Sequence, residues 1–385
     1  MRAVREAKAV DAPGEIKVSR ACVGEEERAA VAAALGEGYF GLGPRVAEFE
    51  AALAARLGVE HVVATSSGTA ALHLALEALD LAAGDEVIVP SLTFVGCFQA
   101  IVAAGAVPVA CDVDPETLCA DVADVRRRIG PRTRAIMPVD YAGAPCDLDA
   151  LLAVAAERGL RVVEDAAHAF GSRRGARPVG GAGDLVCFSF DSIKNVTCGE
   201  GGAVVCRDAA AAERVRRQRV LGVDRGAQAG ARWQERRWEF AVRERGFRYH
   251  MSNLNAAIGL AQLAKLERFV ARRRALCRRY DRALAGVPGL RPLALDRDGI
   301  APHIYVVRVA GGRRDALMAH LRAHGIETGI NYVPNHRHPL FCRPGVRLPV
   351  TERAAAEILT LPLHCGLADA DVDRVAERVG AFLAR

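Results

Sequence analysis

The fold is decided by residues 184–202, which read DLVCFSFDSIKNVTCGEGG. The first part of this stretch is a predicted buried strand, because residues 185–190 are apolar apart from Ser189. The strand leads to Lys194, which lies in a segment of small and polar residues that ends in Gly-Glu-Gly-Gly. An amine in a partly dry pocket has a lowered pKa and can attack a carbonyl carbon. Lys194 is therefore a candidate nucleophile, with a surface lysine at a strand end as the alternative.

The sequence before this stretch alternates between short apolar runs and helical patterns. Such alternation predicts β-α-β units and a mainly parallel sheet between layers of helices. Ligands of such sheets bind beyond the carboxyl ends of the strands, so the residues that follow each strand are the candidates for a site. The expected strands are 62–64, 85–90, 107–111, 135–139, 160–164, 184–190 and 203–207, and the expected helices between them include 70–79, 93–104, 122–129 and 148–158.

Chain length and the alternation of strand and helix patterns predict how the domains are organised. The 385 residues suffice for about two domains. Beyond about residue 285 the regular alternation gives way to a strand-like run at 304–309 and helical patterns at 314–324 and 351–359. We expect an N-terminal arm over residues 1–24, a large α/β domain over 25–265 and a small C-terminal α+β domain over 266–385.

Composition excludes several classes of function. The net charge is +6, and the arginine runs contain acidic residues and lack interleaved aromatic residues, so they predict solvated helix faces and no nucleic-acid partner. A basic rim would also suit a small anionic substrate. The first 20 residues lack a signal-peptide core, and no apolar run is long enough to span a membrane. The 11 cysteines form no CxxC pair, which predicts no metal site and a cytoplasmic location.

Three candidate groups for holding a phosphate and a planar ring follow strands. Gly68 and Thr69 open the helix after the first strand, where free backbone N–H groups and a hydroxyl suit a phosphate. Ordinary helix capping is the alternative reading of these residues. Ser189, five residues before Lys194, is a candidate for the same phosphate. Phe94, after the strand that ends at Pro90, is a candidate to stack on a planar ring, with a core position as the alternative.

The strand at 160–164 is followed by Asp165 and His168. A carboxylate at a buried strand end needs a cationic partner or several donors, and a protonated pyridine nitrogen is such a partner. His168 could then bond a neighbouring ring substituent, while a structural Asp–His pair is the alternative. A phosphate cradle, a carboxylate, a stacking aromatic ring and a nucleophilic lysine are together the parts that pyridoxal phosphate requires.

Seven motifs resemble those of one enzyme family. The chain resembles the DegT/DnrJ/EryC1/StrS family of sugar-nucleotide aminotransferases, which are fold type I pyridoxal-phosphate enzymes. The resemblance runs from about Phe40 to the C-terminus and is most specific around Lys194 and in EDAAHA. The motifs are GLGPRVAEFE (41–50), TSSGTAALHLAL (65–76), GDEVIVPSLTFV (84–95), VVEDAAHAFGS (162–172), FSFDSIKNVTCGEGG (188–202), AAIGLAQL (256–263) and LTLPLH (359–364).

The resemblance implies a role for each candidate. Lys194 would form the internal aldimine, Asp165 would pair with the pyridine nitrogen and His168 would approach the phenolic oxygen. Phe94 would stack on the ring, while Gly68, Thr69 and Ser189 would hold the phosphate. Candidate sugar contacts are Tyr332, Asn335 and His336 in a loop that otherwise reads as an ordinary proline-containing turn, and Phe40 in the glycine-rich loop 36–44.

The chain departs from the family pattern at Arg248. Relatives commonly have an asparagine there, which reaches the cofactor phosphate of the neighbouring subunit. A guanidinium at this position can serve the same phosphate with a bidentate contact, turn toward the sugar diphosphate, or simply lie at the rim. Relatives also tend to have histidine near Asp140, so no substrate role is assigned to that residue.

The implied activity is transfer of the amino group of L-glutamate to a C4 or C3 keto group of a nucleotide-linked keto-deoxy sugar. The reaction would be ping-pong, through the internal aldimine and pyridoxamine phosphate, in a homodimer with shared active sites. One alternative is amination of a keto-cyclitol with the same cofactor residues. The family's dehydratase branch lacks the lysine that is present here. A pyridoxal-phosphate-binding regulator without turnover is the last alternative, although no nucleic-acid reader motif supports it.

Overall fold

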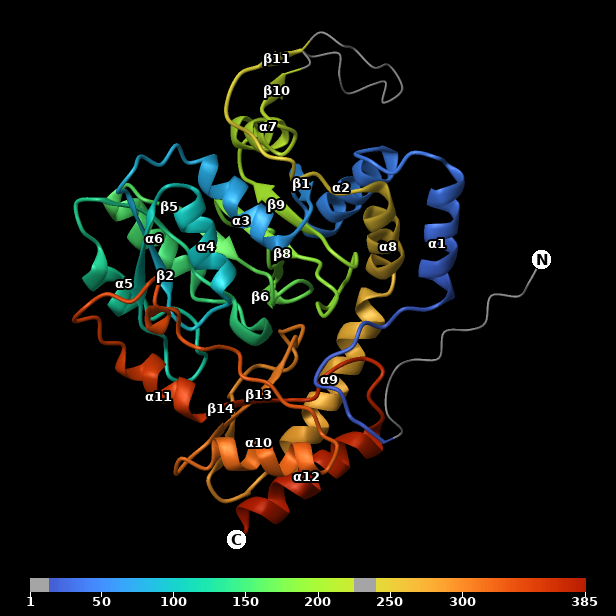
Figure 1. Ribbon diagram of the computed structural model, residues 1–385, viewed down its shortest axis with the longest axis vertical. Helices are drawn as coiled ribbons and strands as arrows, with labels where there is room; N and C mark the ends of the chain where they lie inside the picture. Colours follow the sequence, from blue (N-terminus) through green and yellow to red (C-terminus); the bar gives the residue numbers. More distant parts are fainter. Residues whose placement is uncertain (1–13, 225–239) are drawn as a thin grey trace.

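A seven-stranded sheet forms the centre of the computed structural model, which describes residues 14–224 and 240–385 (Figure 1). The strand order is β1-β9-β8-β5-β4-β2-β3, and β9 alone runs antiparallel to its neighbours. The other six strands therefore end at the same edge, which confirms the prediction of a mainly parallel sheet. The strands are β1 (His61–Thr65), β2 (Glu86–Pro90), β3 (Val107–Cys111), β4 (Thr133–Ile136), β5 (Arg161–Asp165), β8 (Leu185–Ser189) and β9 (Gly202–Cys206).

Helices cover both faces of this sheet because alternate strand residues point to opposite sides. Val87 and Val89 of β2 pack in the same core as α3, α4 and α7, whereas Ile88 packs on the opposite side against α5 and α6. Near β1, β9 and β8 that opposite side is covered by α2 and α8. The helices are α2 (Pro44–Leu57), α3 (Gly68–Glu77), α4 (Val95–Ala103), α5 (Val122–Arg128), α6 (Leu148–Arg158), α7 (Ala209–Gln218) and α8 (Asn253–Leu263).

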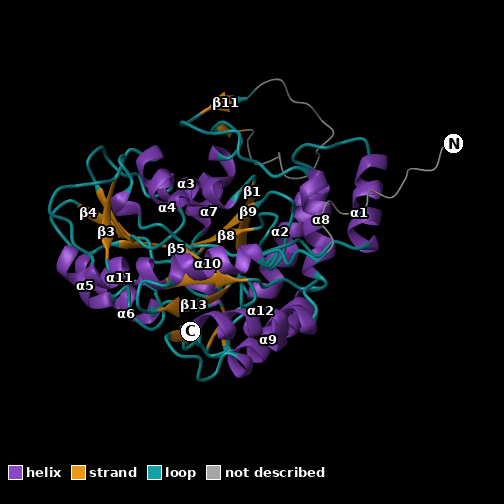
Figure 2. Ribbon diagram, turned by 60° about the horizontal axis from the view of Figure 1, so that its bottom comes forward, coloured by secondary structure: helices purple, strands orange, loops and turns teal. Residues whose placement is uncertain are grey.

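The C-terminal residues build a smaller layer with its own core (Figure 2). A three-stranded antiparallel sheet, in the order β12-β13-β14, packs against α9, α10 and α12. Ile16, from the described end of the predicted arm, is buried in this core and bridges Ile326. The elements are β12 (Leu290–Pro292), β13 (Tyr305–Val309), β14 (Ile358–Leu361), α9 (Leu266–Ala283), α10 (Arg314–Ala323), α11 (Pro349–Glu357) and α12 (Asp369–Leu383).

The observed elements differ from the predicted ones at their ends and by two additional short antiparallel pairs of strands. The predicted helix at 93–104 begins at Val95, with Phe94 extended as its N-cap. Helix α8 begins at Asn253, because the Ser252 hydroxyl accepts the N–H of Asn255 and caps it. These pairs, which the sequence did not predict, are the hairpin of β6 (Arg173–Arg174) with β7 (Arg177–Pro178) and the antiparallel pairing of β10 (Val223–Asp224) with β11 (Ala241–Val242).

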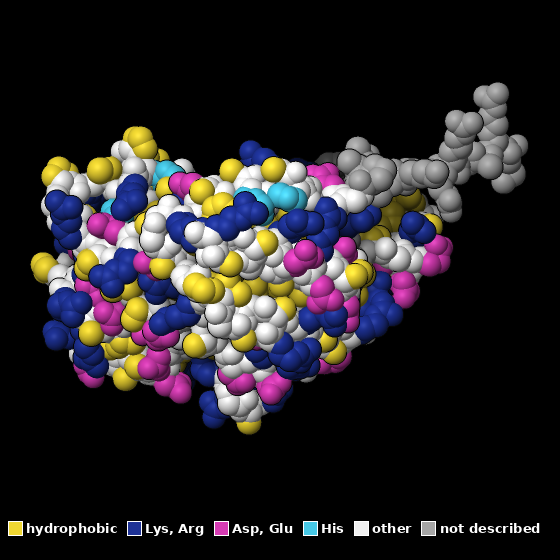
Figure 3. Space-filling model, turned by 90° about the horizontal axis from the view of Figure 1, so that it is seen from below, with side chains coloured by type: hydrophobic (Ala, Val, Ile, Leu, Met, Phe, Trp, Pro, Cys, Tyr) yellow, Lys and Arg dark blue, Asp and Glu magenta, His cyan; other side chains and the backbone are white. Residues whose placement is uncertain are grey.

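The surface is mixed in charge. On the face in Figure 3, Lys and Arg side chains are interspersed with Asp and Glu, as expected for solvated helix faces. Many surface arginines are ion-paired, for example Arg279 of α9 with Asp373 of α12. Among the described residues no helix has both the length and the apolar character needed to cross a bilayer. The N-terminal helix α1 (Glu25–Gly36) packs against α8 at one side of the sheet (Figure 1).

Candidate active site

The N-terminus of α3 lies against the end of β8. Ser67 caps the helix by accepting the N–H of Ala70, which leaves the N–H groups of Gly68 and Thr69 without a protein acceptor among the described residues. A Cβ on Gly68 would lie 2.7 Å from the Cβ of Ser189 and 3.0 Å from its Oγ. Only glycine permits this close approach, which brings the Ser189 side chain against the first residue of α3. The three predicted phosphate residues therefore form one cradle at a helix N-terminus.

Lys194 lies in a compact turn after β8. Its N–H donates to the carbonyl of Asp191 (3.1 Å), and the buried side chain of Asn195 donates to the carbonyl of Ala301 (3.0 Å). These bonds fix the turn at the carboxyl edge of the sheet. Removal from water lowers the pKa of the Lys194 amine, while the charge of Asp165 works in the opposite direction. The turn thus presents an amine that loses its proton more easily than an ordinary lysine.

Asp165 is the last residue of β5, and its carboxylate is buried. One oxygen, Oδ1, accepts the N–H of Ala167 (3.0 Å), and Oδ2 accepts the thiol proton of Cys97 (2.9 Å). Burial raises the pKa of Asp165, whereas these two bonds and the charge of Lys194 lower it. A buried carboxylate with a donor on each oxygen is suited to face a cation such as a protonated ring nitrogen.

The imidazole of His168 is buried beside Asp165 and close to Lys194. Its Nδ1 accepts the N–H of Ala142 (3.4 Å), so the remaining proton is on Nε2, which lies 2.8 Å from the hydroxyl of Tyr332. Burial, followed by the charge of Lys194, lowers the pKa of His168 well below its ordinary value. His168 is therefore a neutral ring whose Nε2–H is available as a donor.

Phe94 is the exposed aromatic residue at this edge of the sheet. It follows β2 and precedes α4, and 53% of its surface is exposed although the neighbouring strand is buried. Its ring centroid lies 5.9 Å from that of Tyr332. A ring exposed to this extent is not a core residue, so the structure disfavours the alternative of a core position. The arrangement leaves one face of Phe94 open to a planar ligand.

Arg248 lies on an extended segment that runs beside the end of β1. Its backbone bridges Val220, and Tyr249 accepts the N–H of Ser66 through its carbonyl (2.7 Å). Phe247 and Tyr249 stack on each other and pack against His73 of α3, so the intervening Arg248 side chain points outward and is exposed. Within the described part of this chain its guanidinium bonds to no residue of the cradle.

Two of the predicted sugar contacts, Asn335 and His336, are buried and hydrogen-bonded within the protein. Asn335 is fully buried, and its amide donates to the carbonyls of Ser91 (3.1 Å) and Thr93 (2.8 Å). His336 is also buried, with Nδ1 2.7 Å from the hydroxyl of Ser91. Both side chains tie the C-terminal part to the loop after β2, which differs from the predicted contact with a sugar. Their buried positions leave little surface for a substrate to reach in this structure.

The other two predicted contacts are accessible. Tyr332 is partly exposed and touches both His168 and Phe94, which places it at the mouth of the site. Phe40 is 46% exposed on the loop between α1 and α2, where its carbonyl accepts the N–H of Asn253. No described contact links Phe40 to Lys194, so it lies apart from the cluster in a single chain.

A buried acidic group lies on the opposite face of β5 from Asp165. Ligand atoms of Asp140, Cys146 and Glu164 lie within 4.8 Å of one another. Arg174 donates to Glu164 (2.8 Å) and lies 3.8 Å from Asp140, and burial raises the pKa of both carboxyls. Arg174 lies within ion-pair distance of both carboxylates, so the group has a cationic partner from its own chain.

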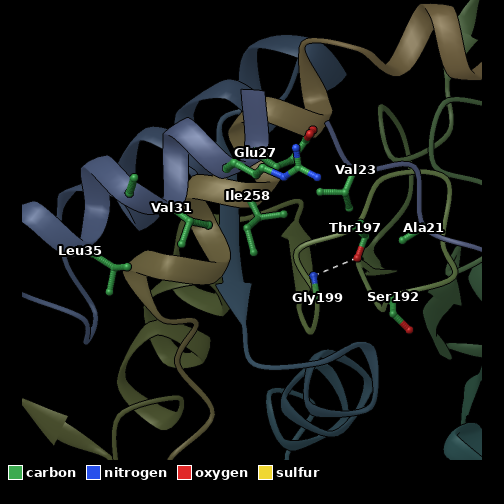
Figure 4. A pocket seen from close by; sticks show the side chains of 11 residues that line it. Ala21, Val23, Glu27, Val31, Leu35, Ser192, Thr197, Gly199 and Ile258 are labelled. Carbon is green, nitrogen blue, oxygen red and sulfur yellow. Dashed lines mark hydrogen bonds between the residues drawn. The ribbon is translucent and has the colours of Figure 1, made fainter. Parts of the chain in front are cut away.

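An apolar pocket of about 440 Å³ opens beside the lysine turn (Figure 4). It lies between α1, α8 and the turn, where the Thr197 hydroxyl accepts the N–H of Gly199 (2.9 Å). Val23 and Leu35 on its rim are 53% and 51% exposed. The residues that line it include Val23, Glu27, Val31, Leu35, Thr197 and Ile258.

Cys97, Thr93 and His303 also lie in the cluster around Asp165 and His168, and none of them was predicted from the sequence. The His303 ring lies 4.4 Å from that of His168, and burial lowers its pKa well below the ordinary value. His303 comes from the loop before β13, so no local pattern links it to His168. Thr93 lies in the loop just after β2, where the rule of inspecting strand ends would have found it, whereas Cys97 lies in the first turn of α4.

Comparison with known proteins identifies the family. The model of the DegT/DnrJ/EryC1/StrS aminotransferase family matches residues 21–380. The chain belongs to this family. Its predicted aminotransferase activity and its dependence on pyridoxal phosphate are thereby confirmed, as is the fold type I architecture.

Solved structures of aminotransferases superpose closely on the chain. TlmJ from Streptoalloteichus hindustanus is 41% identical, with a TM-score of 0.90, over 96% of this chain and 99% of that one. The sugar aminotransferase CalS13 from Micromonospora echinospora is 34% identical, with a TM-score of 0.86, over 95% and 99%. The putative sugar aminotransferase Spr1654 from Streptococcus pneumoniae, in its PLP form, is 28% identical, with a TM-score of 0.88, over 96% and 99%.

The residues at the sheet edge fit pyridoxal phosphate. The free N–H groups of Gly68 and Thr69 with the Ser189 hydroxyl suit its phosphate, and the buried carboxylate of Asp165 suits its ring nitrogen. Phe94 offers an open aromatic face and Lys194 an amine of lowered pKa. The site thus offers one group suited to each of these four parts of the cofactor.

Proposed function

We propose that the enzyme transfers the amino group of L-glutamate to the C4 or C3 keto group of a nucleotide-linked keto-deoxy sugar. The observation that carries the proposal is the cluster of Lys194, Asp165 and His168 beside the α3 cradle. The resemblance to sugar aminotransferases over almost the whole chain supports a sugar as the amino acceptor. The nucleotide carrier of the sugar and L-glutamate as the amino donor are likewise part of the proposal.

Each residue of the cluster has a defined task. Pyridoxal phosphate, when bound, supplies an aldehyde and an electron-accepting ring. Lys194 would provide the amine that holds that aldehyde, and as a free base it would accept and return a proton. Asp165 keeps the ring nitrogen protonated, and the Nε2–H of His168 donates to the phenolic oxygen. Gly68, Thr69 and Ser189 anchor the phosphate, while Phe94 holds the ring plane.

The second part of the proposal is a homodimer in which Arg248 serves the cofactor phosphate of the partner subunit. The outward direction of Arg248 and the absence of a cradle contact within the described part of its own chain support a role across an interface. The apolar pocket with exposed Val23 and Leu35, next to the lysine turn, supports a second copy covering that side.

All 11 cysteines are free, which supports the expected reducing compartment.

The decisive experiment measures 2-oxoglutarate release from L-glutamate with two panels of acceptors. Nucleotide-linked 4-keto and 3-keto deoxy sugars form one panel, and keto-inositols form the other. We expect amination of a nucleotide sugar by the wild-type enzyme and none by Lys194→Ala. Turnover of keto-inositols alone would instead assign the enzyme to cyclitol amination. Borohydride treatment followed by denaturation, which should leave the cofactor covalently attached to the wild-type chain but not to Lys194→Ala, reports the covalent role of Lys194 separately.

A further inference from the structure

The thiol of Cys97 lies against the carboxylate that is expected to face the cofactor ring. Its Sγ is 2.9 Å from Oδ2 of Asp165, and the hydroxyl of Thr93 is 3.3 Å from the same Sγ. All three side chains are buried. They form a continuous hydrogen-bonded row from the loop after β2, through the first turn of α4, to the end of β5. The roles described so far use neither Thr93 nor Cys97.

We propose that Cys97, supported by Thr93, is a positioning residue that holds Asp165 ionised and oriented toward the ring nitrogen of pyridoxal phosphate. A buried carboxylate is stable only when donors satisfy its oxygens. The backbone of Ala167 supplies one donor to Oδ1, and the thiol supplies the only side-chain donor to Oδ2 among the described residues. Removing the thiol would leave Oδ2 with the cofactor nitrogen alone and free the carboxylate to rotate.

The electrostatic surroundings agree with this geometry. Burial raises the pKa of Asp165, and the hydrogen bond from Cys97 is the largest opposing influence. Burial, reinforced by the charge of Asp165, raises the pKa of the Cys97 thiol well above its ordinary value, so Cys97 keeps its proton and remains a donor. The other groups whose charges interact with Asp165 are Lys194, Cys187 and Tyr332. Of these only Lys194 is cationic, and it also favours the ionised carboxylate.

The backbone of Thr93 is itself held in place from the C-terminal part of the chain. Its carbonyl accepts the amide N–H of Asn335 (2.8 Å), and the carbonyl of Ser91 accepts both the backbone N–H and the amide of the same residue. The position of Cys97 therefore rests on a loop that is fixed at both of its ends.

The test compares Cys97→Ala with Cys97→Ser. Alanine removes the donor, whereas serine keeps one of similar size. The readouts are the Kd for pyridoxal phosphate as a function of pH and the visible absorbance of the bound cofactor, both without glutamate or sugar. We expect Cys97→Ala to weaken binding by roughly tenfold, as for loss of a hydrogen bond to a charged group. Because Asp165 then takes up its proton at higher pH, the acid limit of binding moves upward, and serine restores both values.

A matched control is Cys206→Ala. Cys206 is buried in the same core, but it lies at the opposite end of the sheet, paired with Leu185. It should bind the cofactor with the wild-type pH dependence. The proposal fails if Cys97→Ala binds with the wild-type Kd and pH profile, or if a folded Cys97→Ser behaves like alanine. Should Cys97→Ala not fold, Thr93→Val must shift the same pH profile in the same direction by a smaller amount. An unchanged Thr93→Val profile would then overturn the proposal.

Because these measurements use no amino donor or acceptor, they are independent of the proposed substrate. An enzyme that aminated some other ketone would still show the cysteine effect. Conversely, loss of the effect would leave the assignment of glutamate and a nucleotide sugar untouched.

Discussion

Burial and the neighbouring charge of Lys194 keep His168 neutral, and this gives the residue a measurable pH signature. The unfolded chain binds a proton at this position below a pH of about 6.5, whereas the folded chain does so only at much lower pH. The unfolded state therefore binds more protons as the pH falls through that window. Stability linked to His168 is fully present above pH 6.5 and is lost progressively on acidification.

We expect His168→Gln to lose less stability than the wild type between pH 7 and pH 5, by at most about 2 kcal/mol. Glutamine has no proton to gain in this range, while its amide can still donate to the phenolic oxygen. Denaturant unfolding of the cofactor-free proteins at the two pH values measures the difference. His338→Gln, on a partly exposed loop position, is the control and should follow the wild type. Parallel acid losses in all three proteins would contradict the neutral assignment.

At the scale of an element, the N-terminus of α3 depends on the missing side chain of Gly68. A Cβ there would also lie 3.2 Å from the backbone Cα of Ser189, so β8 itself would have to move. We expect Gly68→Ala to cost about 1–3 kcal/mol and to weaken cofactor binding by at least tenfold. Gly380→Ala in α12, where a Cβ meets nothing within 4 Å, is the control. Wild-type affinity in Gly68→Ala, measured by cofactor titration, would exclude this account of the cradle.

The loop that contains Asn335 connects the C-terminal part of the chain to the loop after β2 through buried hydrogen bonds. Asn335→Ala leaves the buried carbonyls of Ser91 and Thr93 without their side-chain donor. We expect a loss of roughly 2 kcal/mol in the free energy of unfolding. Val333→Ala, at an exposed position of the same loop, should cost much less. Equal effects of the two substitutions in urea unfolding would show that the amide bonds contribute little.

At the scale of the whole molecule, the place of Arg248 predicts complementation between subunits. We expect Arg248→Ala to weaken the cofactor phosphate contact, and we expect Lys194→Ala to be inactive. A heterodimer of the two variants keeps one site with Lys194 and the partner subunit's Arg248. That site should have nearly wild-type activity, about half of the wild-type value per dimer.

Differently tagged chains, co-expressed and purified through both tags, provide the heterodimer for this measurement. If Arg248 acts within its own chain, the heterodimer will have no more than half of the Arg248→Ala activity. A monomer in sedimentation experiments would overturn the interface itself.

Candidate site residues could be predicted from the sequence where they directly follow a strand. Lys194, Asp165, Gly68 and Ser189 lie at the common edge because β5, β8 and β1 run in the same direction. The pairing of Tyr332 with His168 was not readable, because it joins residues 164 positions apart. The burial of Asn335 was missed for the same reason. In the sequence, a polar loop residue that faces a ligand cannot be distinguished from one that donates hydrogen bonds to two distant carbonyls.

The attachment of residues 331–336 to the loop after β2 has a consequence for altering substrate preference. A graft of this segment from a relative would exchange Tyr332 at the mouth together with Asn335 at the base. The graft would then disturb Thr93, and through it Cys97 and Asp165. Engineers who treat the segment as a modular recognition loop would therefore change cofactor retention along with selectivity. Residues 91–97 form part of the same transplantable unit and should be exchanged with it.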